Sequence, residues 1–334
     1  MCIRDRSAPR LKIVPIRACL SSQADARDYR LTRDIMDQTT IRVDHAYTDA
    51  MPKEDEVRLY EDRGYHIAPE IVPHDILDAI FGRIAAIQSG ERDRALPANN
   101  AKFSDWKPGD PAPVRNNEFC SLQNDVVRDL VMLPQIGEMA ARLARSAAAR
   151  LFDDQLIYKP PAGENASATA VGWHTDGSYW STCTSSSMLT AWIPLHDTSV
   201  ENGTLYVIEG SHRWPESQHV RNFNDPDLDV IEKLIGRRVP ENLIKPMILK
   251  KGQMSFHHMH ALHASPPNLA KDRPRCAVAL HMQDHDNAHQ AFLTPDGIEI
   301  VLPHDKLCRT RADGTPDYSD PAVFPQIWPA VGGH

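Results

Sequence analysis

A histidine and an aspartate lie two positions apart in the stretch GWHTDGSYW, residues 172–180. Because alternate side chains of an extended strand lie on the same face, we expect His174 and Asp176 to project together while Thr175 points away. An imidazole and a carboxylate on one wall are two of the groups that bind metal ions. Such a pair is more often an ordinary hydrogen-bonded pair, so a metal site needs a third ligand from elsewhere in the chain.

Candidates for that third ligand lie in GQMSFHHMHALHASPPN, residues 252–268. We favour His263, because it lies beside the turn ASPPN, where a side chain can reach the mouth of a barrel. His258 and His260 are at even positions, so a regular strand would place them on the face opposite to His263. Two histidines and a carboxylate on a β scaffold form the facial triad of non-haem Fe(II) oxygenases, which leaves coordination positions open. A structural zinc site usually includes cysteine, and no cysteine here has suitable spacing.

An arginine follows in the apolar run RPRCAVALH, residues 273–281. We expect an antiparallel return of the chain to bring Arg275 beside His263. A guanidinium has paired donors that match a carboxylate, and an arginine that faces a β core needs an anionic partner. Arg273 is the competing candidate, but it lies in the turn before Pro274. Arg275 is therefore the predicted anchor for the far carboxylate of a co-substrate.

Helical spacing characterises the chain before residue 151. The pattern of apolar residues predicts helices over residues 73–90 and 133–151. It predicts a short strand with turns over residues 60–72. Residues 1 to about 55 are polar and irregular, which predicts an extended lead-in. We interpret the opening MCIRDR as partly non-native sequence, with an organelle transit peptide as the alternative. Residues 95–119 predict a loop rich in proline and asparagine.

From about residue 151 the sequence changes to short β-branched and aromatic segments separated by turn-forming residues, which predicts a barrel or sandwich. Asn202–Gly203, between two apolar runs, predicts a tight hairpin. A proline-rich tail begins at about residue 303 and is expected to fold back over the surface. We therefore predict one domain over residues 56–334, with helices first, then the β core, then the tail.

Charge and cysteine content exclude several classes of protein. The net charge of −8 provides no basic surface for nucleic acid, and no apolar run is long enough for a membrane helix. The six cysteines are scattered without a CxxC pair, and no signal peptide is visible. We therefore expect a cytoplasmic protein with a small-molecule substrate, and neither nucleic acid nor membrane as a partner. The oligomeric state is not predicted.

Residues from about 60 to 290 resemble the phytanoyl-CoA dioxygenase family of Fe(II)/2-oxoglutarate oxygenases. The resemblance rests on the order of several motifs and on the spacing of His174, His263 and Arg275. It implies a mainly β fold with flanking helices around a double-stranded β-helix, or jelly-roll, core. The motifs are KPP (159–161), WHTDGSYW (173–180), TAWIPL (190–195), ENGTLYVIEGSH (201–212) and the histidine run.

The same resemblance implies His174, Asp176 and His263 as iron ligands, and Arg275 and Ser265 as the residues that bind the distal carboxylate of 2-oxoglutarate. Trp192 and Gln155 fall where the family lines its co-substrate pocket, although a core role for Trp192 is equally open. Thr175 replaces the glutamine often found between the first two ligands, and Pro266 and Pro267 replace common glycines.

The implied reaction uses Fe(II), 2-oxoglutarate and O2, with ascorbate as a candidate additional cofactor. It decarboxylates 2-oxoglutarate to succinate and hydroxylates an unactivated C–H bond of a small organic substrate. The carboxylate of Asp176 favours hydroxylation over halogenation, in which a small residue takes its place. The alternatives are a catalytically silent binding protein and a zinc hydrolase, and neither explains why Arg275 accompanies a complete triad.

Substrate contacts are the least defined part of the sequence. The aromatic residues Trp173, Tyr179 and Trp180 are candidates for a substrate wall or for core positions. Trp328 and Tyr318 of the tail are candidates for a lid. The loops expected to select the substrate are residues 95–119, 163–170, 214–240 and the tail.

Overall fold

The computed structural model describes residues 45–98, 102–163 and 166–329. The chain divides into two compact units, Met1–His45 and Ala46–His334, and the strands and helices considered below belong to the second unit. Most of the predicted lead-in, residues 1–44, lies outside the described residues.

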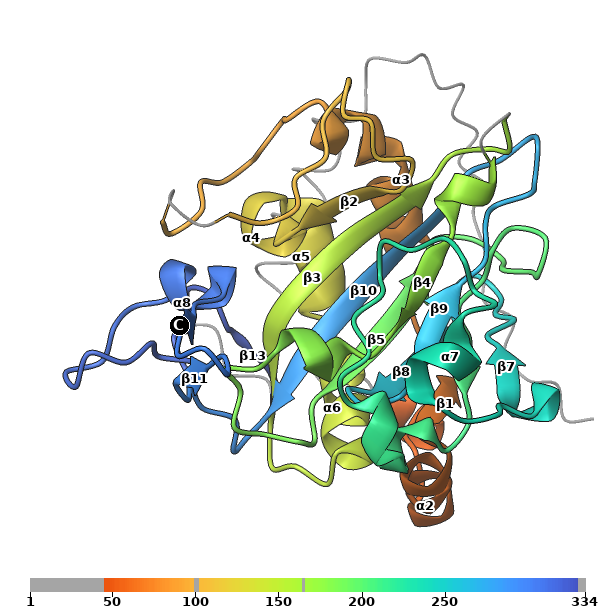
Figure 1. Ribbon diagram of the computed structural model, residues 1–334. Helices are drawn as coiled ribbons and strands as arrows, with labels where there is room; N and C mark the ends of the chain where they lie inside the picture. The colour runs from red at the N-terminus through yellow and green to blue at the C-terminus, as the bar shows by residue number, and fades with distance from the viewer. Residues whose placement is uncertain (1–44, 99–101, 164–165, 330–334) are drawn as a thin grey trace, which may run out of the picture. The chain divides into compact units, whose positions relative to one another are not determined.

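The larger of two main sheets has seven antiparallel strands in the order β1-β8-β5-β10-β3-β13, with β2 also paired to β3 (Figure 1). β3 and β10 are its long central strands, and every residue of β10 is buried. The apolar run around Arg275 is therefore a strand covered on both faces. The strands are β1 (Tyr65–Ala68), β2 (Arg115–Glu118), β3 (Ala149–Lys159), β5 (Leu189–Pro194), β8 (Met254–His258), β10 (Arg275–Asp284) and β13 (Gln326–Trp328).

The smaller sheet has four antiparallel strands: β4 (Val171–His174), β9 (His263–Ser265), β6 (Tyr206–Ile208) and β7 (Ile244–Pro246), in that order. Apolar side chains of both sheets share one core, in which Val207 of β6 lies with Ile157 of β3 and Ala277 of β10. Two facing antiparallel sheets with their core between them form the predicted double-stranded β-helix. The predicted mainly β fold with flanking helices is confirmed.

Helices cover the outer faces of the two sheets. α6 (Pro134–Leu143) contacts β3, β5 and β13, and α3 (His74–Gln88) contacts α5 (Asp125–Val131) behind the large sheet in Figure 1. α7 (Ile231–Ile235) packs against Trp173 and the smaller sheet. None of the helices in the described part of the chain is long and apolar enough to cross a membrane. The other helices are α2 (Glu54–Arg63), α4 (Cys120–Gln123) and α8 (Pro303–Leu307).

Three local predictions were wrong at their boundaries. Residues 54–63 form helix α2, where the sequence indicated lead-in and turns, because α2 buries only Val57 and Tyr60 and lacks a broad apolar stripe. The predicted helix 133–151 ends at Leu143, and Arg145 has a φ of +48°. The chain then enters β3 at Ala149, so pairing in the sheet overrides the helical propensity of the alanines. Within the expected loop 95–119, residues 115–118 form β2.

The turn at Asn202–Gly203 exists, but the predicted hairpin does not. Gly203 has a φ of +69°, and a side chain there would collide with the carbonyl oxygen of Pro266. The flanking strands β5 and β6 belong to different sheets, so the turn carries the chain from one sheet to the other.

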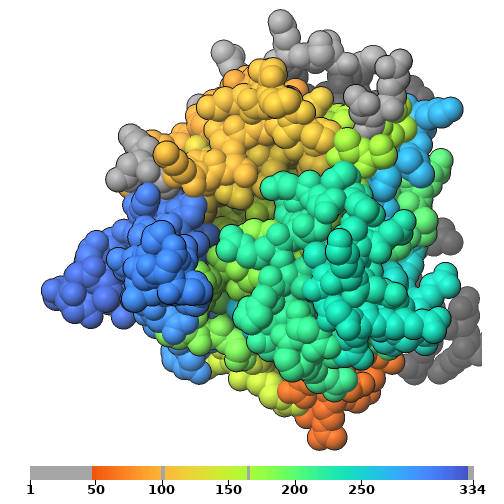
Figure 2. All heavy atoms as spheres, in the orientation of Figure 1, coloured from red at the N-terminus to blue at the C-terminus, as the bar shows by residue number. Residues whose placement is uncertain are grey.

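The tail is part of the fold rather than a surface cover. Strand β13 pairs with β3 and extends the large sheet. Tyr318 is completely buried, which makes the predicted lid role of this residue wrong. Figure 2 shows one face on which the orange and yellow residues before β3, the teal residues between β6 and β8, and the blue C-terminal residues border one another.

Candidate metal centre

Two neighbouring strands of the smaller sheet position the histidines of the predicted triad. His174 is the last residue of β4 and pairs directly with His263, the first residue of β9. Asp176 lies beyond the strand, at the start of a 3-10 turn, Asp176–Tyr179. The strand alternation used to predict the site therefore ends at His174, and the turn rather than the pleat brings Asp176 to the same wall.

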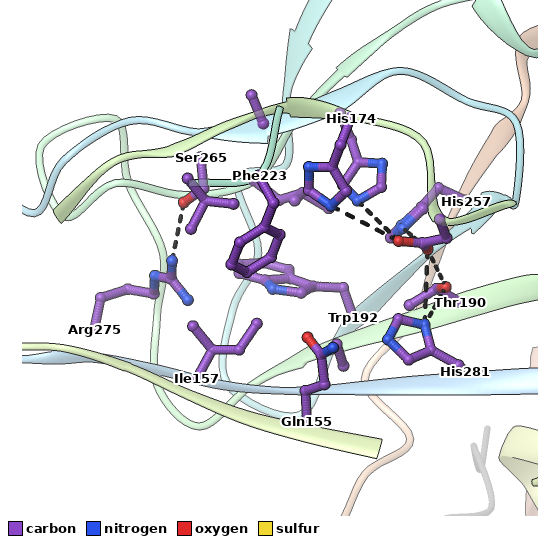
Figure 3. A pocket seen from close by; sticks show the side chains of 16 residues that line it. Gln155, Ile157, His174, Thr190, Trp192, Phe223, His257, Ser265, Arg275 and His281 are labelled. Atoms are coloured by element: carbon purple, nitrogen blue, oxygen red, sulfur yellow. Dashed lines mark hydrogen bonds and ion pairs between the residues drawn. The ribbon is translucent and has the colours of Figure 1, made fainter. Parts of the chain in front are cut away.

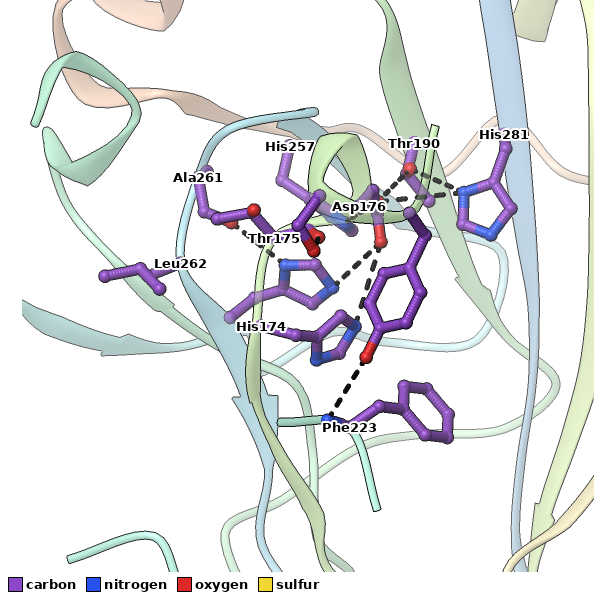
Figure 4. Close-up of polar contacts among 12 residues, drawn as sticks. His174, Thr175, Asp176, Thr190, Phe223, His257, Ala261, Leu262 and His281 are labelled. Carbon is purple, nitrogen blue, oxygen red and sulfur yellow. Dashed lines mark hydrogen bonds and ion pairs between the residues drawn. The ribbon is translucent and has the colours of Figure 1, made fainter. Parts of the chain in front are cut away.

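The three side chains converge on one oxygen of the carboxylate. Oδ1 of Asp176 lies 3.8 Å from Nε2 of His174 and 3.4 Å from Nε2 of His263 (Figure 4). One ligand atom from each residue lies within 4.8 Å of the other two, and all three residues are buried. Among the described residues this is the one group of three histidine, cysteine or acidic side chains with that geometry.

Backbone carbonyls fix both imidazoles with Nε2 toward the carboxylate. Nδ1 of His174 lies 2.8 Å from the carbonyl oxygen of Gly172, and Nδ1 of His263 lies 3.0 Å from that of Ala261. A carbonyl only accepts, so Nδ1 carries the proton and the lone pair of a neutral ring is on Nε2. This orientation of metal-binding histidines by a second hydrogen bond is usual in metalloproteins.

Burial and mutual charges set the protonation of the three groups. Burial and the neighbouring His263 lower the pKa of His174 to about 3. Burial alone would raise the pKa of Asp176, but His263 and His281 outweigh it and hold that pKa well below its usual range. Burial opposes a charge on His263, yet Asp176 raises its pKa above the usual value. The carboxylate is therefore an anion in a buried site that favours a cation beside it.

Three further residues hold the other carboxylate oxygen and were not predicted from the sequence. Thr190 donates a hydrogen bond of 2.5 Å to Oδ2 of Asp176, and Nε2 of His257 lies 3.2 Å from the same atom. Nδ1 of His281 lies 2.8 Å from the Thr190 hydroxyl. His281 has the same parity as Arg275 in β10, so strand alternation places both on one face, but it does not show which strands lie beside them. His257 and His263 belong to strands of different sheets, so their positions in the sequence gave no such signal.

Arg275 and Ser265 lie together at the other end of the cavity that the triad lines (Figure 3). Nη2 of Arg275 donates a hydrogen bond of 2.9 Å to Oγ of Ser265. The guanidinium is buried, and its Nε and Nη1 have no hydrogen-bond partner among the described residues. The predicted antiparallel return is wrong, because β9 and β10 belong to different sheets that face each other. Arg275 reaches the site across the core rather than from a neighbouring strand.

The two remaining predicted pocket residues line the same cavity. Trp192 lies between the ends of the cavity in Figure 3, with its ring 5.8 Å from the Arg275 guanidinium carbon. Gln155 also lines it, and its amide nitrogen lies 3.4 Å from Oε1 of Glu118. Phe223, which the sequence did not single out, contributes an aromatic edge against His174, with ring centroids 5.0 Å apart.

The structure separates the three aromatic residues that were candidates for a substrate wall or for core positions. Trp173 lies in the core cluster under α7, and its indole nitrogen donates to the carbonyl of Leu228. Trp180 packs against Phe152 and His281. Tyr179 faces the ring of His174, with centroids 6.1 Å apart. Trp173 and Trp180 are therefore core residues, and Tyr179 supports a ligand.

A family model described as phytanoyl-CoA dioxygenase (PhyH) matches residues 60–277, which include the whole triad and Arg275. The chain belongs to the phytanoyl-CoA dioxygenase family. It is accordingly an Fe(II)/2-oxoglutarate-dependent oxygenase. Two imidazoles and a carboxylate suit a ferrous ion, and the Nε and Nη1 donors of Arg275 that have no partner among the described residues suit a co-substrate with a second carboxylate.

Curated members and relatives of the phytanoyl-CoA dioxygenase family match parts of the chain. It is 25% identical over 224 residues to a probable alpha-ketoglutarate-dependent hypophosphite dioxygenase of Stutzerimonas stutzeri, covering 65% of this chain and 74% of that protein. It is 29% identical over 148 residues to phytanoyl-CoA dioxygenase domain-containing protein 1 of Bos taurus, covering 42% of this chain and 48% of that protein. The second match thus spans about half of the bovine protein.

Solved structures share the fold of this family member. The epimerase SnoN from nogalamycin biosynthesis, crystallised with Fe3+, alpha ketoglutarate and nogalamycin RO, superposes with a TM-score of 0.59 at 24% identity, covering 82% of this chain and 98% of that chain. EctD from S. alaskensis, with 2-oxoglutarate and 5-hydroxyectoine, has a TM-score of 0.55 at 20% identity, covering 75% and 81%. The two proteins show that this fold accommodates different ligands.

Proposed function

We propose that this oxygenase is a hydroxylase that inserts one oxygen atom into an unactivated C–H bond of a small organic substrate. His174, Asp176 and His263 hold the iron in this proposal. Arg275 receives the distal carboxylate of 2-oxoglutarate, while Ser265, Trp192 and Gln155 complete its pocket. The family match lies within the proposed single domain of residues 56–334.

The observation that carries the proposal is a buried guanidinium, without a carboxylate partner among the described residues, in the same cavity as the triad. Two nitrogen atoms of Arg275, Nε and Nη1, lack hydrogen-bond partners among the described residues, and the residue is 1% exposed. A buried cation without a counter-ion is costly, so an anion is expected to occupy this end of the cavity. A zinc hydrolase has no use for such a group. A catalytically silent binding protein has no reason to retain the buried triad beside it.

The chain's own contribution is to ligate, orient and exclude water. Iron bound at the triad supplies oxygen activation driven by the decarboxylation of 2-oxoglutarate to succinate and CO2. Backbone bonds to His174 and His263 keep both Nε2 atoms directed at one point. The aromatic rings of Trp192 and Phe223 line the cavity between its two ends and form apolar walls around the proposed position of 2-oxoglutarate.

The carboxylate of Asp176 supports hydroxylation over halogenation, because it would hold the iron where a halogenase has a small residue that leaves room for a halide. Hydroxylation and epimerisation both fit the same metal and co-substrate, so the two reactions are distinguished by analysing the product. A reaction under 18O2 distinguishes the two outcomes. A hydroxylase incorporates label into the product, whereas an unlabelled product of unchanged mass contradicts the proposal.

The first experiment is an anaerobic titration of Fe(II) and 2-oxoglutarate. We expect the weak visible charge-transfer band of an iron–keto acid chelate in the natural chain and its loss in Asp176→Ala. Arg275→Met should still bind iron and should lose affinity for 2-oxoglutarate. A natural chain that binds Fe(II) and yet gives no band with 2-oxoglutarate contradicts the assignment of the co-substrate.

The substrate class is tested by succinate release across a panel, with Asp176→Ala as the inactive control. The panel contains acyl-CoA thioesters, small osmolytes and hypophosphite. Hypophosphite is included because the relative from Stutzerimonas stutzeri is a probable hypophosphite dioxygenase. The segments proposed to select the substrate are residues 95–119, 163–170 and 214–240 and the tail. On the face shown in Figure 2, the described residues of 95–119 (orange to yellow), 214–240 (teal) and the tail (blue) border one another.

A cytoplasmic location remains part of this proposal. The four cysteines in the described part of the chain, Cys120, Cys183, Cys276 and Cys308, are free and buried. Free cysteines are usual in a reducing compartment.

A further inference from the structure

A second buried cation lies beside Arg275. Lys159 is the last residue of β3, is 0% exposed and pairs directly with Arg275 across the two central strands. Like charges directly opposite each other in a sheet are destabilising, and burial increases the cost. The motif KPP that contains Lys159 is one of those that carry the family resemblance, but the mechanism above gives it no role.

The hydrogen bonds of Lys159 match the three donors of its charged form. Nζ lies 2.9 Å from the carbonyl oxygen of Ser265, 2.6 Å from its Oγ and 2.6 Å from the carbonyl oxygen of Pro266. Three acceptors around one nitrogen match the three N–H donors of an ammonium, whereas a neutral amine has two. Burial and the charge of Arg275 both lower the pKa of Lys159, so this geometry is maintained against a cost.

No carboxylate among the described residues forms an ion pair with either cation. Nζ of Lys159 is bonded to the neutral oxygens just named, and Ser265 is the side chain that Arg275 hydrogen-bonds in the described part of the chain. Arg275 therefore lines the distal end of the cavity, Lys159 lies directly beside it on the neighbouring strand, and neither is paired with a carboxylate in the described part of the chain. Such an arrangement selects a ligand whose charge is more negative than that of a simple monocarboxylate.

Ser265 connects the two cations and has no free hydrogen. Its Oγ accepts from Nζ of Lys159 and from Nη2 of Arg275, and it donates to the carbonyl oxygen of Gly203 at 2.8 Å. The hydroxyl proton is thus directed at Gly203. In this arrangement the unpartnered Nε and Nη1 of Arg275 are the donors available to a carboxylate, and Ser265 fixes the guanidinium that carries them.

We infer that Lys159 is a positioning residue for the co-substrate. Lys159 holds Ser265 as a bridge to Arg275, and its positive charge adds to that of Arg275 in selecting a co-substrate with a distal carboxylate. This inference rests on the proposed function, because it assumes that a keto acid occupies the cavity. It assigns Ser265 the role of a support, where the family resemblance implied direct contact with the carboxylate.

The test compares two keto acids of equal chain length on anaerobic Fe(II)-loaded protein. 2-Oxoglutarate carries the distal carboxylate, and 2-oxovalerate has a methyl group in its place. Affinity is measured from the visible charge-transfer absorbance. For Lys159→Met we expect 2-oxoglutarate to bind about ten- to a hundredfold more weakly, the range for losing an interaction with a charged group. Affinities for 2-oxovalerate and for Fe(II) should stay unchanged.

Matched variants separate this outcome from a general defect. Lys250→Met removes an exposed lysine paired with Asp197, and we expect natural affinities for both keto acids. Lys159→Gln is a second neutral variant, which keeps an amide donor for the carbonyl oxygens and should lose selectivity as the methionine variant does. Lys159→Arg retains the charge and should preserve the preference for 2-oxoglutarate.

The possible failures are distinguishable. If the natural chain binds neither keto acid, the proposed function fails. If the natural chain binds both and Lys159→Met weakens them equally, or weakens neither, the inference is wrong while the function stands. If both neutral variants are unfolded by circular dichroism, the ammonium is needed for the fold, and this result also overturns the inference.

Discussion

Thr190 donates a hydrogen bond of 2.5 Å to Oδ2 of Asp176, while Oδ1 of the same carboxylate faces the Nε2 atoms of His174 and His263. The two oxygens of one side chain therefore have separate tasks. Oδ1 is directed at the metal position, and Oδ2 is tied to the large sheet through β5. Because Thr190 pairs with His281 of β10 and His257 of β8, three neighbouring strands share in holding one carboxylate.

Removal of this hydrogen bond should weaken the metal site. Thr190→Val keeps the shape of the side chain and removes the donor, so the carboxylate gains freedom to rotate. We expect affinity for Fe(II) to fall by about ten- to a hundredfold, as is typical for partners of metal ligands. The measurement is an anaerobic titration against a competing chelator. Thr190→Ser, which restores a hydroxyl, should recover most of the affinity, and equal affinities in all three proteins would contradict the assigned role.

The sequence identified the triad because its spacing and its neighbouring motifs are local patterns. His174, Asp176 and His263 are each embedded in a recognisable run, and the family resemblance supplied their order. His257 and His281 were missed because their role arises only when β8 and β10 lie beside β5. Sequence periodicity gives the face of a strand, and it does not give which strands are neighbours.

The errors in predicting helix α2 and the hairpin at Gly203 also arise because contacts between distant segments cannot be read from local sequence. Helix α2 escaped notice because EDEVRLYEDR is mostly polar and is stabilised by contacts with α6 and β1 rather than by a wide apolar face. The turn at Gly203 was correctly located, but its local geometry does not show that β5 and β6 lie in different sheets. Tertiary pairing decided both cases.

The C-terminal helix should contribute to stability through one buried hydrogen bond. Nε2 of His304 in α8 lies 2.5 Å from Oδ2 of Asp153, and its ring stacks on Phe152 at 4.0 Å between centroids. His304→Phe retains the stacking and leaves Asp153 without this partner. We expect the free energy of unfolding in urea to fall by about 1–3 kcal/mol, the cost of an unsatisfied buried group. His304→Ala loses the stacking as well, so it should be less stable than His304→Phe, and the reverse order would refute this account.

Metal binding should raise thermal stability. The ionised Asp176 is buried beside imidazoles whose Nε2 atoms lie toward it, so a divalent cation that binds only the folded state stabilises it by mass action. At a free metal concentration about a hundred times the Kd the expected gain is about 2.7 kcal/mol. Differential scanning calorimetry with Fe(II) under argon measures the shift in Tm. Asp176→Ala should show no such shift, whereas a shift of equal size would place the cation elsewhere.

Acid should destabilise the fold through a histidine cluster at the end of β8. The ring of His258 lies next to those of Tyr60 of α2, His212 and His260. Burial and the charges of His212 and His260 lower the pKa of His258 to about 3. In the unfolded chain the pKa of a histidine is about 6.5. Between these values the unfolded state binds the additional proton, so stability is lost as the pH falls below about 6.5 toward 3.

His258→Gln should therefore lose less stability than the natural chain when the pH of urea unfolding is lowered from 7 to 5. Carboxylates that are charged in the folded state also contribute to acid unfolding, so the informative quantity is the difference in slope between the two proteins. His285→Gln replaces an exposed histidine of the same unit and should retain the natural slope. Identical slopes in all three proteins would show that His258 takes up its proton equally in both states, contrary to its buried contacts with His212 and His260.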